Sequence, residues 1–263
     1  PISEIIVENG QSTGIRLESG EVIRARTVAA NTAAPITFGR MVDQRHLPED
    51  FRREIGTYRS TGSAFKINCA VDRAPQYRNF DPEKAGVPYP AYAHIGPSVD
   101  YFERAYDEAK YGWYSSKPYM SPIVPSAVDD TLAPAGKHVV TLYGGQAPYE
   151  LKGASWDDEQ DNFVKNVMDV MDTYCPGFSD SIIDMDVYLP RDMERIVGLP
   201  KGHEVHGDIN LDQLFLKRPV AGYADYRSPI RGLYQCGASS HPGGAVSCVP
   251  GHNAAREILR DKR

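Results

Sequence analysis

The chain has 263 residues, and its 29 lysines and arginines against 35 aspartates and glutamates give a formal net charge of −6 at pH 7. This acidic balance argues against a nucleic-acid partner, which would need a basic face. Hydrophobic residues make up 41% of the chain and charged residues 24%, a composition typical of folded globular proteins and not of disordered ones. Because no run of about eighteen apolar residues occurs, the sequence predicts no transmembrane segment.

The cysteines and the first residues bear on location. Four scattered cysteines form no C-x-x-C pair, which argues against a disulfide scaffold and against a zinc ribbon. We therefore expect a reducing, cytoplasmic location, and leave peripheral association with a membrane open. The opening sequence PISEIIVENG lacks the parts of a signal peptide. It also lacks an initiator Met and begins almost inside a strand, which indicates a chain cut from a longer one.

The amino-terminal segment has a β-strand pattern. Residues 5–26 predict a three-stranded meander with turns at Asn9-Gly10 and Ser19-Gly20. A further strand is expected over residues 27–30. A short helix then opens at Pro48, which suits the first turn of a helix.

The middle of the chain predicts a sheet and several helices. Residues 63–72 alternate as a half-buried strand does, and residues 182–189 alternate again with Ile183 and Met185 among the inward side chains. Helices are expected after the caps Ser98 and Ser155, where the second has an acidic first turn. The other expected elements are strands over residues 89–95, 119–124 and 138–144 and a helix over residues 190–197.

The last part of the chain, residues 232–256, reads GLYQCGASSHPGGAVSCVPGHNAAR. It predicts a short buried strand over residues 233–236, a glycine turn, and a helix that starts near Cys248. Such a geometry aims unpaired backbone N–H groups and the positive end of a helix dipole at an anion or at a polar ring edge. A tight packing turn that binds nothing explains the same pattern, and both interpretations stay open at this point.

The segment LYQCGASSHPGGAVSCVPGHNAA resembles the C-terminal flavin motif of the phytoene-desaturase-like FAD oxidoreductases. The resemblance extends over nearly the whole chain. Five other stretches that fit the same family are KINCAVDR at residues 66–73, DDTLAPAGKHVVTL at 129–142, YCPGFSDSII at 174–183, MERIVGLPKG at 193–202 and LDQLFLKRPV at 211–220.

The resemblance implies an α+β fold in a fragment of a two-domain flavoprotein, with an α/β remnant of the FAD domain and a mixed-sheet substrate domain. Residues 1–35 would supply a meander and a strand of the FAD domain, residues 36–224 the substrate domain, and residues 225–263 the C-terminal FAD-binding strand, turn and helix. The family's N-terminal strand–GxGxxG–helix does not occur in this sequence. FAD would therefore be bound mainly by the missing N-terminal half, and we expect the fragment alone to be inactive.

The family motif also assigns roles to residues. Gly237 and Ala238 would meet the ribityl-phosphate part of FAD, and a helix amino terminus nearby would stabilise negative charge on the reduced flavin. The implied reaction removes a hydride and a proton from an apolar or planar small molecule. The other cofactor-binding candidates would present backbone N–H groups to the pyrimidine edge; they are Gly243, Gly244, Ala245 and Val246.

Three histidines are candidates for chemistry. His241 lies inside the motif and is the candidate proton carrier, or else its imidazole packs beside Pro242 and shapes the loop. His203 and His206 form an H-x-x-H pattern close to Asp208. Because a metal ion needs three or four converging ligands, a solvated polar loop is the favoured interpretation and no metal site is predicted.

Alternatives of another class stay open. Ten of the sixteen tyrosines lie between residues 77 and 149, which suits a large planar ligand, a protein interface or the core of the covering sheet. Lys66 and Asp72 are either surface charges, the favoured interpretation, or part of a substrate cleft. The alternative functions are a non-enzymatic interaction module on a degenerate flavoprotein fold, with residues 77–149 as its partner surface, and an amine-oxidase-like activity on the same fold.

Overall fold

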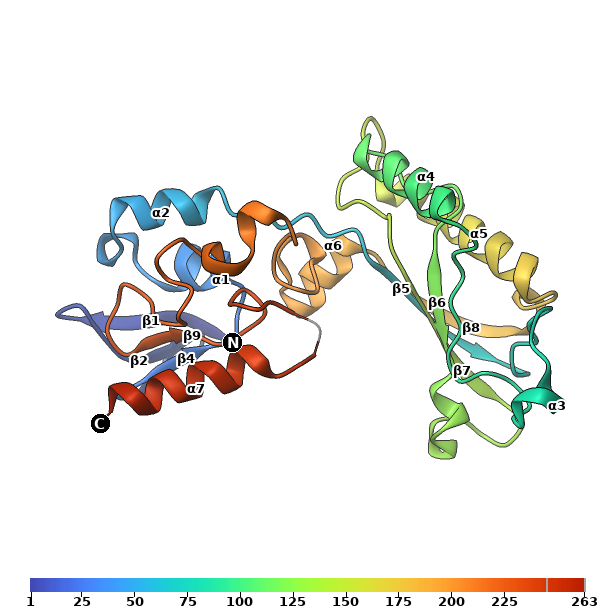
Figure 1. Ribbon diagram of the computed structural model, residues 1–263, viewed down its shortest axis with the longest axis horizontal. Helices are drawn as coiled ribbons and strands as arrows, with labels where there is room; N and C mark the ends of the chain where they lie inside the picture. Colours follow the sequence, from blue (N-terminus) through green and yellow to red (C-terminus); the bar gives the residue numbers. More distant parts are fainter. Residues whose placement is uncertain (245, 263) are drawn as a thin grey trace. The chain divides into compact units, whose positions relative to one another are not determined.

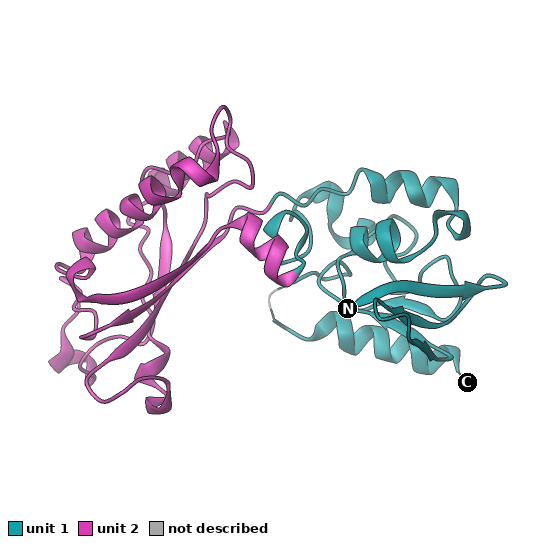
Figure 2. Ribbon diagram, turned by 180° about the vertical axis from the view of Figure 1, so that it is seen from behind, with its two compact units in different colours: residues 1–61, 198–263 teal, residues 62–197 magenta. Residues whose placement is uncertain are grey.

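The computed structural model of the protein describes residues 1–244 and 246–262. The chain divides into two compact units (Figure 2): unit 1 consists of residues 1–61 and 198–263, and unit 2 of residues 62–197. Unit 1 is thus built from both ends of the chain. Both boundaries of unit 2 fall inside the predicted substrate-domain segment 36–224. The functional roles of the predicted segments 1–35, 36–224 and 225–263 stay predictions.

Unit 1 contains two small sheets (Figure 1). Its first three strands form an antiparallel meander, as the turn residues predict. The fourth strand pairs in parallel with the last strand of the chain, with Val28 opposite Leu233 and Ala30 opposite Gln235. The elements of unit 1 are β1 (Ile2–Glu8), β2 (Gln11–Leu17), β3 (Val22–Arg24), β4 (Val28–Ala30), α1 (Ala34–Ile36), α2 (Glu49–Gly56), β9 (Leu233–Gln235) and α7 (Val249–Asp261).

The core of unit 1 joins the two ends of the chain. Phe51 of α2 packs its ring edge-on against Phe38 and Tyr223, with 4.9 Å between ring centroids in each pair. Ile5 from β1 and Leu233 from β9 are buried in the same apolar cluster. Burial of such side chains stabilises the fold by about 1.5–3 kcal/mol each, so the cluster holds the terminal segments together.

Unit 2 contains one antiparallel sheet of four strands in the order β6-β7-β5-β8. Together with the helices that flank it, this sheet confirms the predicted α+β class. The elements of unit 2 are β5 (Phe65–Val71), α3 (Pro82–Ala85), α4 (Val99–Lys110), β6 (Met120–Ile123), β7 (His138–Gly144), α5 (Trp156–Tyr174), β8 (Ile182–Tyr188) and α6 (Pro190–Asp192), which a π-helical turn (Met193–Val197) extends.

One face of this sheet is covered by α5. Phe163 of α5 lies edge-on to Phe65 at 5.0 Å between ring centroids and edge-on to Trp156 at 5.5 Å. Both predicted caps are present, because the side chains of Ser98 and Ser155 each accept a backbone N–H of the first helical turn. The inward residues of β5 are fully buried, as predicted.

Two local predictions are wrong. Residues 89–95 pair through isolated bridges at Tyr92 and Ile95 and not as a continuous strand, because Pro90 in this stretch and Pro122 on the partner strand β6 have no backbone N–H to donate. Ile183 and Met185 are 51% and 38% exposed. β8 is an edge strand, and an irregularity in its pairing with β5 leaves Ile183 as an extra residue, which ends the inward alternation.

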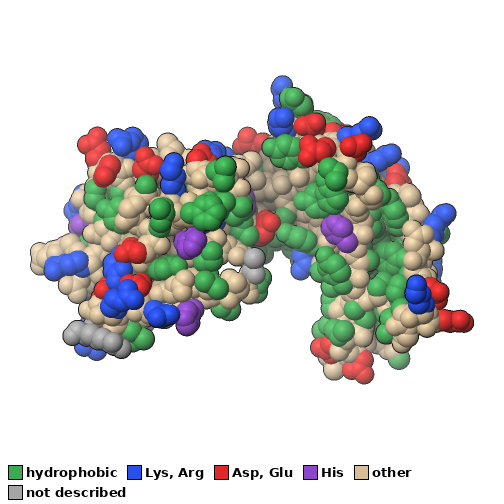
Figure 3. Space-filling model, viewed as in Figure 1, with side chains coloured by type: hydrophobic (Ala, Val, Ile, Leu, Met, Phe, Trp, Pro, Cys, Tyr) green, Lys and Arg blue, Asp and Glu red, His purple; other side chains and the backbone are tan. Residues whose placement is uncertain are grey.

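Basic and acidic side chains lie intermixed on the face seen in Figure 3. In the part of the chain that the structure describes, no helix combines the length and the apolar character that crossing a bilayer requires. The cytoplasmic location stays a prediction.

Candidate functional site

A hollow of about 530 Å³ opens in unit 1 where β4 and β9 end and α7 begins. The two strands stay joined just beyond β9, where the backbone N–H of Cys236 donates to the carbonyl oxygen of Ala30 at 2.9 Å. The chain then runs through the glycine-rich turn into α7. The described residues that line this glycine-turn hollow are Asn31, Cys236, Gly237, Ala238, Gly243, Gly244, Val246, Ser247, Cys248, Pro250, Gly251 and His252.

The glycine-turn hollow brings the predicted cofactor-binding residues together. The carboxyl ends of parallel strands are where open α/β sheets bind ligands, and the hollow lies at such ends. Ala245 lies outside the described residues. Contact of the others with a cofactor stays a prediction; those that line the hollow are Gly237, Ala238, Gly243, Gly244 and Val246.

Two glycines give this hollow a wall of bare backbone. A Cβ atom at Gly237 would lie 2.5 Å from Oδ1 of Asn31 and 2.6 Å from its backbone oxygen, so a side chain there would push the turn away from the end of β4. Gly243 has a φ of +109°, which residues with side chains rarely adopt. The close approach of the turn to β4 therefore requires glycine at 237, and the backbone conformation of the turn favours glycine at 243.

Two buried serines anchor the turn. Ser239 Oγ accepts the backbone N–H of Ala34 at 2.9 Å and donates to the carbonyl oxygen of His206 at 3.2 Å. Ser240 Oγ donates to the carbonyl oxygen of Gln235 at 3.1 Å. Neither serine is among the predicted site residues, although hydroxyls at the start of a turn commonly bond to nearby backbone.

The amino end of α7 lies at the hollow with one long side-chain contact, in which the backbone N–H of Val249 donates to Ser247 Oγ at 3.4 Å. Cys248 occupies the N-cap position with a φ of +59° and makes no capping hydrogen bond, and the first turn of the helix holds no acid. Pro250 and Gly251 of that turn line the hollow. The positive end of the helix dipole is therefore available to a negative or polar group placed there.

The comparisons with known proteins cover almost the whole chain. No family model matches it. Pyridine nucleotide-disulfide oxidoreductase domain-containing protein 2 of Rattus norvegicus is 37% identical over 258 residues, which make up 96% of this chain and 44% of that protein. Phytoene desaturase (neurosporene-forming) of Cereibacter sphaeroides is 26% identical over 261 residues, or 98% of this chain and 47% of that protein.

The resemblance to the phytoene-desaturase-like oxidoreductases is confirmed. The fold is also shared with a solved oxidoreductase from Methanosarcina mazei, with a TM-score of 0.58 at 15% identity over 99% of this chain and 48% of that one. The chain spans about half the length of the curated relatives it matches.

His241, the candidate proton carrier from the phytoene-desaturase-like motif, does not line the hollow. Its carbonyl oxygen accepts the hydroxyl of Tyr226 at 2.9 Å, and its imidazole lies 6.2 Å from the ring of Phe215. Its Nδ1 atom is buried without a hydrogen-bond partner among the described residues. These contacts suit the packing role proposed for the imidazole, and a catalytic role stays a prediction.

The H-x-x-H loop is less exposed than the solvated polar loop favoured from the sequence, because His203 and His206 are half-buried while Glu204 is exposed. His203 Nε2 lies 3.5 Å from a carboxylate oxygen of Asp208. Burial holds the pKa values of His203 and His206 below their usual range, and the charge of Arg218 adds to this effect. Within residues 1–244 and 246–262, no three His, Cys, Asp or Glu side chains converge where they could hold a metal ion.

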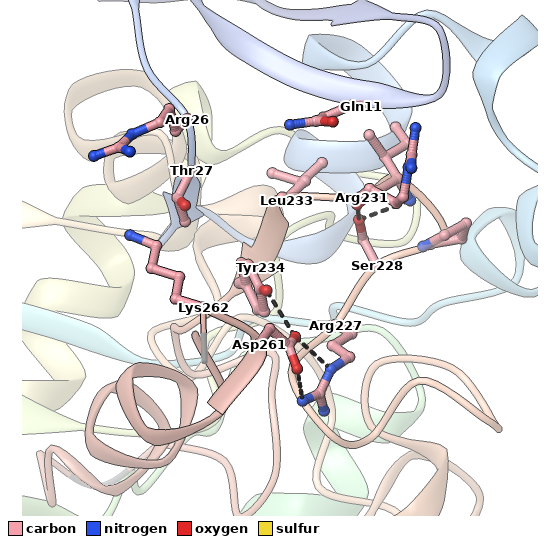
Figure 4. Close-up of a pocket in the computed structure, with 13 residues that line it drawn as sticks. Gln11, Arg26, Thr27, Arg227, Ser228, Arg231, Leu233, Tyr234, Asp261 and Lys262 are labelled. Carbon is pink, nitrogen blue, oxygen red and sulfur yellow. Dashed lines mark hydrogen bonds and ion pairs between the residues drawn. The ribbon is translucent and has the colours of Figure 1, made fainter. Parts of the chain in front are cut away.

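A second hollow of about 650 Å³ lies at the opposite, amino-terminal ends of β4 and β9 (Figure 4). Its polar groups bind one another: Arg227 donates to both carboxylate oxygens of Asp261 at 2.7 and 2.8 Å, and the hydroxyl of Tyr234 donates to the same carboxylate at 2.8 Å. These bonds fasten α7 to β9. This larger hollow thus has a structural explanation, and none of the motif's candidates lines it.

In unit 2, the candidate Lys66 of β5 alternates with the buried residues Phe65 and Ile67 and therefore lies on the sheet face opposite α5. Lys66 is half-buried, with Tyr143 and Tyr188 opposite it on the two neighbouring strands. Asp72, beyond the end of β5, is exposed and pairs with Arg73 at 2.9 Å, as a surface charge does.

The tyrosine-rich segment 77–149 divides between core and surface. Tyr77 and Tyr114 pack in the apolar core of unit 2, whereas Tyr92, Tyr106 and Tyr111 are 59%, 53% and 71% exposed. The core explanation therefore accounts for part of the segment. A partner surface on the rest stays a prediction.

Proposed function

We propose that this chain supplies the ring-binding end of the FAD site of an oxidoreductase. The observation that carries the proposal is the glycine-turn hollow, where bare backbone at the ends of β4 and β9 lies next to the amino end of α7, whose N-cap residue makes no side-chain hydrogen bond. Similarity along nearly the whole chain to proteins named as an oxidoreductase and a desaturase supports a general redox role.

The residues of the hollow fit one end of a flavin. The bare backbone at Gly237 and Gly243 lets a planar ring approach, and the positive helix end suits a ring edge that gains negative charge on reduction. By the family motif, Ala238 would lie with Gly237 at the ribityl-phosphate part, and residues 243–246 at the pyrimidine edge. When bound, FAD would supply the hydride acceptor.

The rest of the FAD site lies outside these 263 residues in this proposal. A strand–GxGxxG–helix would grip the pyrophosphate and the ribose, and the chain spans less than half the length of the rat relative. The fragment would orient the flavin ring but bind FAD weakly by itself, so we propose that it is inactive alone.

The proposed reaction removes a hydride and a proton from an apolar or planar organic small molecule, with unit 2 as the substrate-binding part. The name of the phytoene desaturase relative supports this substrate class. So does the row formed by Tyr143, Lys66 and Tyr188 across three strands, because the two tyrosines on either side of Lys66 offer aromatic surface to a flat or extended apolar molecule.

An absorption spectrum of the full-length gene product tests this proposal. We expect flavin bands that bleach on anaerobic reduction, and a lower flavin content in the variant Gly237→Ala, whose added methyl group would collide with Asn31. Gly39→Ala is the matched control, since no atom lies within 4 Å of its added Cβ. A folded, colourless protein that takes up no added FAD would contradict the proposal.

A further inference from the structure

Arg218 is the largest fully buried side chain in the described part of the chain, with no exposed surface. Its guanidinium binds backbone carbonyl oxygens from two separate loops. Nη2 donates to Val205 at 2.7 Å and Nε donates to Ala238 at 2.9 Å. Longer contacts of 3.3–3.4 Å reach the carbonyl oxygens of Gly207, Asp208 and Gln213.

This buried charge has no carboxylate within ion-pair distance among the residues that the structure describes. Burial lowers the pKa of Arg218, while Asp208 at longer range opposes that effect. A buried cation held by neutral carbonyl groups is costly compared with an apolar or neutral polar side chain. Structural tethering alone therefore does not explain why the residue is charged.

The position of Arg218 relates it to the glycine-turn hollow. Ala238, which accepts its Nε–H, lines the hollow, and so does Gly243. A Cβ atom at Gly243 would lie 3.5 Å from Nε and 3.9 Å from the guanidinium carbon. The charge thus lies directly behind the wall of the hollow, which the positive end of α7 also borders.

We propose that Arg218 is a buried positive charge that stabilises the reduced, negatively charged form of the flavin at the glycine-turn hollow and positions the turn that carries it. The inference rests on the proposed function. A hydride brings two electrons and one proton, so the reduced ring carries one negative charge unless it takes up a second proton. A fixed charge in a water-excluded wall acts on that ring more strongly than a solvated one would.

The test compares Arg218→Lys with Arg218→Gln in the flavin-loaded, full-length protein. Both variants lose the guanidinium fork and most of its bonds, but only the lysine keeps the charge. Midpoint potentials of the bound flavin are measured against a reference dye under anaerobic conditions. Arg59→Gln is the control, because it removes a charge of the same kind from an exposed position of unit 1.

We expect Arg218→Gln to weaken the binding of reduced relative to oxidised flavin at least tenfold, which lowers a two-electron potential by about 30 mV. Arg218→Lys and Arg59→Gln should stay within about threefold of the wild type. Equal potentials in the Lys and Gln variants would overturn the proposal and leave Arg218 a purely structural tether. A wild-type protein without flavin would instead overturn the proposed function.

Sulfite gives a second measurement if Arg218→Gln does not fold. Sulfite adds to oxidised flavin and leaves a negative charge on the ring, so a nearby positive charge favours the adduct. The wild type and Arg218→Lys should both take up sulfite, with affinities within about threefold. A flavin-loaded wild type that takes up no sulfite would contradict the proposal.

Discussion

The two units are stabilised in different ways. Unit 2 is continuous in sequence and is built around a single apolar cluster in which aromatic rings of α5 pack on an antiparallel sheet. Unit 1 has three-residue strands in its parallel pair, and buried polar groups, such as Arg218 and Ser239, that bind backbone atoms of distant segments supplement its apolar cluster. The unit that contains the candidate site thus combines apolar burial with specific hydrogen bonds between distant segments.

The largest expected effect tests the apolar core of unit 2. Phe163→Ala removes a fully buried ring that contacts Phe65, Tyr114 and Trp156. We expect it to lower the free energy of unfolding by about 3–5 kcal/mol. Both tryptophans belong to unit 2, so tryptophan fluorescence in a urea titration reports on this unit.

The control for that variant is Ile183→Ala, at a 51% exposed position of β8. It should change the free energy of unfolding by less than about 0.5 kcal/mol. Equal losses in Phe163→Ala and Ile183→Ala would show that burial does not dominate unit 2.

The next effect tests the glycine turn of unit 1. Gly237→Ala should destabilise this unit by about 1–3 kcal/mol, because the new methyl group overlaps Asn31. Hydrogen exchange followed by mass spectrometry should show faster exchange in β4 and β9, with β5 and β7 unchanged. Gly39→Ala should leave exchange in all four strands as in the wild type. Unchanged hydrogen exchange in the Gly237→Ala variant would refute the close approach of the turn to β4.

A smaller effect tests the bonds that hold α7. The hydrogen bond from Arg227 holds the pKa of Asp261 below its ordinary value of 3.8, and the hydrogen bond from Tyr234 is the second cause. A carboxyl group whose pKa is lower in the folded than in the unfolded chain stabilises the fold at pH values above its unfolded pKa. This contribution is lost as the pH falls through the pKa of the folded chain. We therefore expect the α7 amides to lose protection, measured as the exchange rate relative to that of an unfolded chain at the same pH, as the pH falls below about 3.8.

The variant that removes this dependence is Arg227→Met. It should weaken α7 at neutral pH, by less than Gly237→Ala weakens unit 1, and should flatten the acid response of exchange in α7. Arg231→Met is the control, since Arg231 lines the same hollow but only its 3.4 Å bond to the Asn9 carbonyl is lost. An acid response that survives in Arg227→Met would assign it to another carboxyl group.

The smallest expected effect belongs to the surface of unit 2. Lys165 and Asp169 form an exposed i,i+4 pair on α5 at 2.6 Å. Lys165→Ala should cost about 0.3–0.5 kcal/mol at low salt and less at high salt, measured by urea unfolding. A loss above about 1 kcal/mol would contradict the small contribution expected of a solvated ion pair.

The sequence predicts most regular elements where a single period dominates, as in β5 and α5. It fails at residues 89–95, where prolines interrupt the ladder, and at Ile183, where the change of register depends on the partner strand. Pro90 lies in the segment itself but does not alter its alternation, whereas Pro122 and the change of register act through a partner strand.

The candidate site likewise has parts that the sequence predicts and parts that it does not. The glycine turn could be located from its motif, because glycines, strand and helix are close in sequence. Arg218 could not, since its carbonyl partners at Val205 and Ala238 lie on irregular loops that have no periodic pattern. Asn31 is likewise brought to the turn only by the pairing of β4 with β9.

The pairing of β5 with β8 has a consequence for biosynthesis. Lys66 lies opposite Tyr188, near the two points where the chain enters and leaves unit 2. Once the middle of the nascent chain has folded on the ribosome, Lys66 and Tyr188 are held on neighbouring strands about 5 Å apart. Folding of unit 2 has then already reduced the entropic cost of bringing β4 and β9 together. β9 and α7, which follow unit 2 in the chain, can therefore complete the earlier half of unit 1 as soon as they emerge.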